Sequence, residues 1–310
     1  MAHHPLSGLR KGRWIPALSL ASLVLAACGG EVHPGAIATS PSASTPPLQA
    51  VMATAEIVFG KDQRVAVGIL DTNQVPVPYA SVRVQIQTIP PAGTGPMAVG
   101  PVEDAPYNGG SPGHDILQGK GVYVTHVSFD TPGFYRAVVD ASKDGVSTRT
   151  TAAFTVYGKD PTPAVVARAP ATENPTRDQV SDISVIDTGV PPDDMHYTSV
   201  AGALGAHHPF LVYFGSPGFC VSRTCGPEVE VVKSLEPTSH PRGVDFIHIE
   251  TYKGGRPDAQ RTTSPWFDEW KLQSDPWVFV VDRTGIIRAK FEASTGPQEI
   301  QSAIDAVAAT

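Results

Sequence analysis

Cysteine, basic residues and long apolar runs are all scarce in this chain. Its 310 residues include three cysteines, and 23 Lys and Arg stand against 30 Asp and Glu, a formal net charge of −7. Three cysteines are too few for a disulfide-rich scaffold or a four-cysteine zinc site. The deficit of basic residues argues against nucleic acid as a partner. After the first 27 residues, no stretch is long and apolar enough to predict a membrane-spanning helix.

The amino terminus has the organisation of an export signal. Three basic residues between positions 10 and 13 precede the apolar run 15–24, which is too short to cross a bilayer. The next residues, Leu-Ala-Ala-Cys-Gly at 25–29, resemble a bacterial lipobox, which implies that Cys28 is lipidated and becomes the first residue of the mature protein. The alternative is an ordinary secretory signal with a chance cysteine. We therefore expect a signal peptide at 1–27 and an extracytoplasmic protein anchored to a bacterial membrane through lipid.

Composition divides the expected mature chain, which has 20 basic and 30 acidic residues and a formal net charge of −10. Residues 28–53 are rich in Ser, Thr and Pro and lack hydrophobic periodicity, which predicts a disordered tether. A second aperiodic stretch at 159–179 predicts a linker. The chain is long enough for two domains, which we expect at 54–158 and 180–310.

Short alternating runs in the first of these segments predict antiparallel β-sheet. The runs cover residues 64–70, 81–86, 121–127, 134–139 and 153–156, and turn residues separate them. The expected fold is an immunoglobulin-like β-sandwich, and residues 65–86 resemble the immunoglobulin-like modules of bacterial surface proteins. A long loop rich in Pro and Gly holds His114 and Asp115, for which a solvated loop is favoured over a metal site.

The second segment alternates strands and helices, which predicts an α/β domain. Strands are expected at 183–186, 209–214, 244–249, 277–281 and 286–291, and helices at 199–205, 220–235 and 297–308. The last helix has the clearest apolar stripe, and only a hairpin fits between the last two strands.

A cysteine pair lies where the strand 209–214 gives way to a helix. The amino-terminal end of a helix favours the thiolate, the reactive form of sulfur, so Cys220 and Cys225 are candidates for thiol chemistry. Two lone neighbouring thiols in an exported protein are also expected to form a disulfide. That disulfide is either structural or redox-active. So short a loop gives little chain-entropy stabilisation, which favours the redox role.

The order of elements resembles the thioredoxin fold, and three motifs carry the resemblance. The first is the strand 210–214 leading to Phe219-Cys220, the second is Cys225-Gly226-Pro227, and the third is Asp275-Pro276-Trp277 at the start of the fourth strand. In that family a cis-proline at the last position faces the reactive cysteine and helps hold the substrate backbone. The resemblance implies this role for Pro276, with no cofactor and no metal.

The cysteine spacing departs from the family, because four residues separate Cys220 from Cys225 where thioredoxins have two. Positions i and i+5 of a helix rise about 7.5 Å, beyond the usual Cα separation of a disulfide. Either Cys220 lies in a loop and the helix begins near Cys225, or the first turn opens when the disulfide forms. In the preferred register Cys220 is the nucleophile and Cys225 the resolving cysteine. In the other register, Cys225 lies at the helix terminus and Glu228 occupies the position of the family's second cysteine.

Residues near the site have two interpretations each. Glu250 ends the third strand and is either a proton relay or a solvated carboxylate. With the cysteines, His248 could offer a copper or zinc site, which would resemble thioredoxin-like proteins of the Sco type. Those proteins have three residues between the cysteines and a histidine late in the domain, and this sequence lacks that pattern. Trp266, Trp270 and Trp277 either fill the core, which is favoured, or form a wall for a protein substrate.

These observations predict a membrane-tethered thiol-disulfide oxidoreductase that acts on the thiols and disulfides of exported proteins. The alternative is a non-catalytic binding lipoprotein with a static disulfide or a Sco-like copper site. The direction of the redox chemistry and the oligomeric state stay open.

Overall fold

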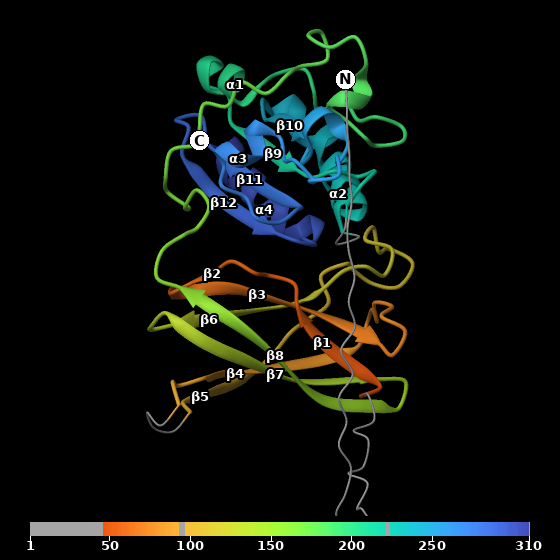
Figure 1. Cartoon of the computed structure of the whole chain (residues 1–310), viewed down its shortest axis with the longest axis vertical. Helices are drawn as coiled ribbons and strands as arrows, with labels where there is room; N and C mark the ends of the chain where they lie inside the picture. Colours follow the sequence, from red (N-terminus) through yellow and green to blue (C-terminus); the bar gives the residue numbers. More distant parts are fainter. Residues whose placement is uncertain (1–45, 93–96, 221–223, 310) are drawn as a thin grey trace, which may run out of the picture. The chain divides into compact units, whose positions relative to one another are not determined.

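The computed structural model describes residues 46–92, 97–220 and 224–309. The expected signal peptide, the lipidation site Cys28 and most of the expected tether lie outside the described residues. Contacts join residues 45–310 into one compact unit. The described chain is mostly β-sheet, with three sheets and a few helices (Figure 1). None of its described helices is long and apolar enough to cross a membrane.

The first part of the described chain forms two sheets. The strands are β1 (Leu48–Met52), β2 (Ile57–Val58), β3 (Gly60–Asp71), β4 (Ser81–Thr88), β5 (Val99–Asp104), β6 (Tyr123–Phe129), β7 (Gly133–Lys143) and β8 (Val146–Tyr157). One sheet has the order β1-β3-β6 and the other β2-β8-β7-β4-β5. Alternate residues such as Val82, Val84 and Ile86 are buried in a core that both sheets share. The alternation in the sequence therefore does bury one face of each sheet.

The first strand corrects the boundary of the expected tether. Residues 48–52 were included in that tether, yet they form β1, which pairs antiparallel with β3. Leu48 and Ala50 point into the core while Val51 is exposed. Five residues are too few for this period of two to stand out beside a stretch rich in Ser and Pro.

The long loop of this part is built around a carboxylate. Asp115 accepts hydrogen bonds from the hydroxyls of Tyr79 (2.8 Å) and Tyr107 (2.9 Å) and from the backbone N–H groups of Leu117 (2.9 Å) and Gly119 (2.8 Å). The loop that was expected to be solvated is therefore ordered around Asp115, and the Asp115 side chain has a structural role.

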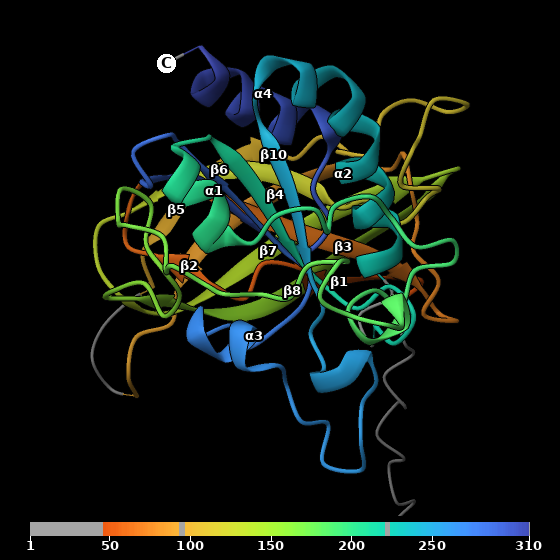
Figure 2. The ribbon, with the colours of Figure 1, turned by 90° about the horizontal axis from the view of Figure 1, so that it is seen from above.

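The second part of the chain contains a four-stranded sheet in the order β10-β9-β11-β12. Its strands are β9 (Phe210–Phe214), β10 (Asp245–Ile249), β11 (Trp277–Val281) and β12 (Ile287–Glu292), and its helices are α1 (Val200–Ala206), α2 (Cys225–Ser239), α3 (Pro265–Glu269) and α4 (Pro297–Ala308). β9 and β10 are parallel, whereas β11 is antiparallel to both β9 and β12. Apolar residues of α2 and α4 cover one face, and those of α1 and α3 cover the other (Figure 2).

Two expected elements of this part are corrected. Residues 183–186, expected as a strand, contain the 3-10 helix Ile183–Val185, because the Asp182 side chain accepts a hydrogen bond from the N–H of Ser184 and caps a helical turn. The helix expected at 220–235 begins at Cys225 and ends at Ser239. Pro227 consequently lies in the first turn of α2, where its nitrogen needs no intrahelical partner, whereas a helix starting at residue 220 would have put it about two turns in.

The expected linker is irregular but packed. Val166 N–H donates to the carbonyl of Ile287 (2.8 Å), and Ala169 N–H to that of Gly285 (2.9 Å). The Trp270 indole donates to Thr172 Oγ1 (2.8 Å) in the core. Residues 159–179 therefore belong to the folded structure beside β12 and α3.

Candidate functional site

The two cysteines meet at the end of the fully buried strand β9. Cys220 and Cys225 form a disulfide with a Cα–Cα distance of 5.8 Å, within the usual range for such bonds. Since α2 begins at Cys225, Cys220 lies in the preceding loop. The wide cysteine spacing is thus accommodated by a loop before the helix, the first of the two geometries that the spacing allowed.

The two sulfurs differ in their environment. Cys225 is fully buried, whereas Cys220 is partly exposed. The backbone N–H of Cys225, at the start of α2, donates to Sγ of Cys220 at 3.2 Å. A helix amide and the helix dipole stabilise negative charge on sulfur. This arrangement suits Cys220 as the attacking thiolate and Cys225 as the inner partner.

Polar contacts hold the loop that carries Cys220. Thr188 Oγ1 accepts from the N–H of Gly218 (3.0 Å) and donates to Oε1 of Glu250 (2.5 Å). Nε2 of His248 lies 3.1 Å from the carbonyl oxygen of Gly215. His248 lies on β10 and Glu250 directly follows it, so the end of β10, together with Thr188, positions the loop after β9.

Asp275 lies beside the disulfide, and the peptide bond between Asp275 and Pro276 is cis. A carboxylate oxygen of Asp275 lies within 4.8 Å of both sulfurs. Thr251 Oγ1 donates to Asp275 at 2.9 Å, while burial raises the pKa of the carboxyl. The sequence singled out Pro276 and treated Asp275 only as its neighbour. The available sequence signal was the Asp-Pro pair at the start of the fourth expected strand, which puts Asp275 at this end of β11.

We expect Asp275→Asn to lower the pKa of the free thiols by about one unit after the disulfide is reduced, because a negative charge within a few ångströms disfavours the thiolate. The pH dependence of the alkylation rate by iodoacetamide measures this pKa. Glu269→Gln, which alters an exposed carboxylate of α3, is the matched control. Equal thiol pKa values in Asp275→Asn and the unaltered protein would contradict an electrostatic role for Asp275.

The other residues that the sequence singled out near the cysteines lie in buried or partly buried positions. Glu250 is buried and bonded to Thr188, so it is not a solvated carboxylate. His248 contacts Asp193 and the Gly215 carbonyl. Its possible partners in a metal site are Asp187, Asp193 and His196, and not the two cysteines. Trp270 and Trp277 are buried in the core and Trp266 packs against it, as favoured by the sequence.

Comparison with known proteins gives partial likenesses to solved structures. No family model and no curated protein matches the chain. Solved structures that resemble part of it include a thiol:disulfide interchange protein of the thioredoxin family from Chlorobium tepidum (13% identity, 33% of this chain and 81% of that chain, TM-score 0.28). Others are the PmoD soluble domain from a Methylocystis strain (15%, 33% and 78%, TM-score 0.21) and the PKD domain of human SorCS2 (18%, 44% and 97%, TM-score 0.19). At such scores these likenesses establish neither fold nor function.

Proposed function

We propose that the chain is a lipoprotein, anchored through Cys28 outside the cytoplasm, that exchanges disulfides with exported proteins. Its residues 180–310 would form a thioredoxin-like domain and residues 54–158 an immunoglobulin-like sandwich. The observation that carries the proposal is a partly exposed Cys220, bonded to a buried Cys225 at the start of a helix that follows a buried strand.

The topology of the four-stranded sheet supports the thioredoxin-like interpretation. A parallel pair, β9 and β10, is joined by α2, and an antiparallel pair, β11 and β12, follows and leads into α4. The cysteines lie at the carboxyl end of β9, and a cis-proline lies directly before β11, which is paired with β9. Fold order, cysteine position and cis-proline therefore agree with the family that the sequence motifs resemble.

The proposed exchange proceeds in two steps that balance. The Cys220 thiolate attacks one sulfur of a partner disulfide, forms a mixed disulfide and releases the other partner sulfur as a thiolate. Cys225, as a thiolate, then attacks Sγ of Cys220, so the Cys220–Cys225 bond forms and the second partner sulfur leaves. The partner is reduced and this chain is oxidised; the reverse sequence oxidises a partner. In this proposal Asp275, whose carboxylate lies near both sulfurs, takes the proton of Cys225, and Pro276 aligns the partner backbone.

The reduction potential of the disulfide tests the proposal against a static disulfide. We expect the purified full chain, equilibrated with glutathione or dithiothreitol buffers and then trapped, to show a potential above about −300 mV, because structural disulfides lie below that value. Because Cys220 is partly exposed, we also expect this exchange to be fast. A potential below that limit, with slow exchange, would support the non-catalytic alternative.

A further inference from the structure

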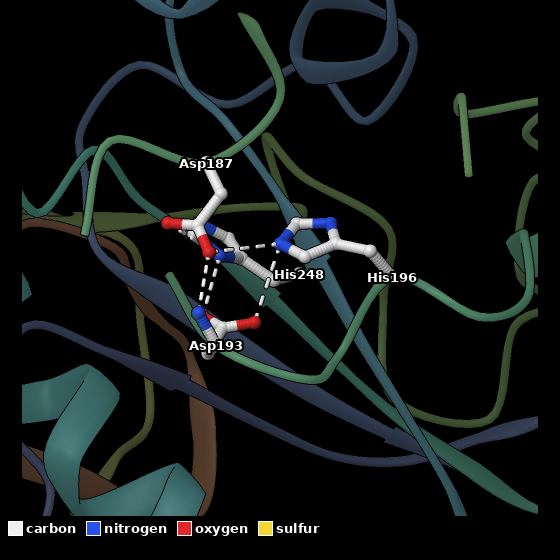
Figure 3. A group of neighbouring side chains, drawn as sticks. All are labelled: Asp187, Asp193, His196 and His248. Carbon is white, nitrogen blue, oxygen red and sulfur yellow. Dashed lines mark hydrogen bonds and ion pairs between the residues drawn. The ribbon is translucent and has the colours of Figure 1, made fainter. Parts of the chain in front are cut away.

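A second cluster of chemically competent side chains lies at the outer edge of β10, away from the sulfurs. It consists of Asp187, Asp193, His196 and His248, all of them buried (Figure 3). The side chains converge, and one ligand atom from each lies within 4.8 Å of the others. Three of the residues come from the irregular segment before α1 and one from β10.

The distances between these atoms suit a small tetrahedral ion. Nε2 of His196 lies 3.3 Å from Oδ2 of Asp187 and 3.2 Å from Oδ1 of Asp193. Nδ1 of His248 lies 2.9 Å from Oδ2 of Asp193 and 4.0 Å from Oδ1 of Asp187. Each aspartate faces the two histidines with different oxygens, and with one ligand atom from each residue the atoms lie within 4.8 Å of one another. Four ligands at about 2.0–2.1 Å from a zinc ion are about 3.3 Å apart, so the side chains would turn and close around the ion on binding.

His196 provides an independent indication of a ligand. Its side chain is 1% exposed and points into the cluster (Figure 3). Nε2 lies within ion-pair distance of Asp187 and Asp193 but in hydrogen-bond geometry with neither, and Nδ1 has no hydrogen-bond partner within the described part of the chain. A buried polar group without such a partner costs about 1–3 kcal/mol. A metal ion at the centre would use the lone pair of Nε2 and remove the part of this cost that falls on Nε2.

The surroundings of the cluster orient the other ligands. Asp187 accepts from the N–H groups of Gly189 (2.7 Å) and Asp193 (2.6 Å), and Asp193 accepts from that of Met195 (2.9 Å). Nε2 of His248 faces the Gly215 carbonyl at 3.1 Å, which leaves Nδ1 for the ion. Metal-binding histidines characteristically donate their second N–H to a carbonyl or carboxylate in this way.

We propose that Asp187, Asp193, His196 and His248 bind one Zn²⁺ ion in a closed, four-coordinate site. Two imidazoles and two carboxylates suit zinc, and the burial of all four matches structural sites, which leave no position for substrate. A pocket of about 260 Å³ that borders Asp193 offers a path for entry. Through the His248–Gly215 contact, the ion would also fix the loop that carries Cys220. The site uses no sulfur, so it stands independently of disulfide exchange.

Zinc binding to the full chain, with its disulfide intact, tests the proposal. After treatment with a chelator, equilibrium dialysis against Zn²⁺ should give one ion per chain, and the unfolding midpoint should rise with Zn²⁺ concentration, because the ion binds the folded state. His196→Leu should weaken binding more than 100-fold, beyond the 10–100-fold cost of losing an outer-shell partner. The matched control is His208→Leu, which alters an exposed histidine paired with Asp245 and should bind as the unaltered protein does.

Two results would overturn the proposal: no stoichiometric Zn²⁺ in the unaltered protein, or unchanged affinity in His196→Leu. If His196→Leu does not fold, the visible spectrum of Co²⁺ bound to the unaltered protein tests the proposal instead. We expect the visible ligand-field bands of four-coordinate Co²⁺ without a sulfur-to-cobalt charge-transfer band. A charge-transfer band would place the ion at the cysteines, and absent visible bands would exclude a four-coordinate site; either contradicts the proposal.

Discussion

Cys225→Ser should accumulate mixed disulfides with exported proteins, whereas Cys220→Ser should accumulate almost none. Cys220 is the partly exposed sulfur and accepts a hydrogen bond from the first amide of α2, so its thiolate can attack a partner disulfide. Cys225 is fully buried and is bonded to the sulfur of Cys220, so it is shielded from a partner. Without Cys225 the second step fails, and the mixed disulfide persists. Loss of Cys220 should lower trapped product by at least tenfold.

Trapping is measured by acid quenching, alkylation and non-reducing electrophoresis of the full chain exported in cells. The double variant is the control for background capture. Trapping by Cys220→Ser but not by Cys225→Ser would reverse the two roles and favour the register in which Cys225 is the reactive residue. Absence of trapping in both would remove the exchange proposal and leave a static disulfide.

The sequence was informative wherever a local pattern determines the structure. The alternating apolar runs located β3, β4, β6 and β7, and the stripe ending in Val307 gave the bounds of α4. The cysteine spacing indicated that the pair could not lie in a regular helix, and the structure has Cys220 outside α2. In each case the signal lies within about a dozen residues.

The remaining features depend on contacts between distant segments. Asp187, Asp193 and His196 occur in a stretch without periodicity, and only its packing against β10 brings them to His248: the N–H of His248 donates to the Met195 carbonyl at 2.8 Å. The strand β1 is likewise determined by its pairing with β3, whose closest paired residue is fifteen positions away along the chain. No local pattern predicts such contacts, because burial and pairing there are decided by tertiary structure.

Glu228 is a buried acid whose pKa makes the stability of this chain depend on pH. The side chain lies on α2, three residues after Cys225, and is fully buried. Its Oε2 accepts from the N–H of Thr295 at 2.7 Å, whereas Oε1 has no hydrogen-bond partner among the described residues. Burial raises its pKa to about 8 from an ordinary value of 4.5, despite the hydrogen bond from Thr295, which lowers it. The folded chain therefore holds a proton that the unfolded chain releases at a much lower pH.

The sign of the resulting pH dependence follows from linkage. The folded pKa is above the unfolded one, so the stabilising contribution is complete below about pH 4.5 and is lost as the pH rises through about 8. We expect the free energy of unfolding to fall by about 4 kcal/mol relative to Glu228→Gln between pH 5 and pH 9, since one pKa unit corresponds to about 1.36 kcal/mol. Urea unfolding of both proteins across this range measures the difference. Glu230→Gln, on the exposed side of α2, is the matched control and should keep the pH slope of the unaltered protein. Parallel curves for Glu228→Gln and the unaltered protein would show that Glu228 is ionised in the folded state, because only a proton retained on folding makes the two curves diverge.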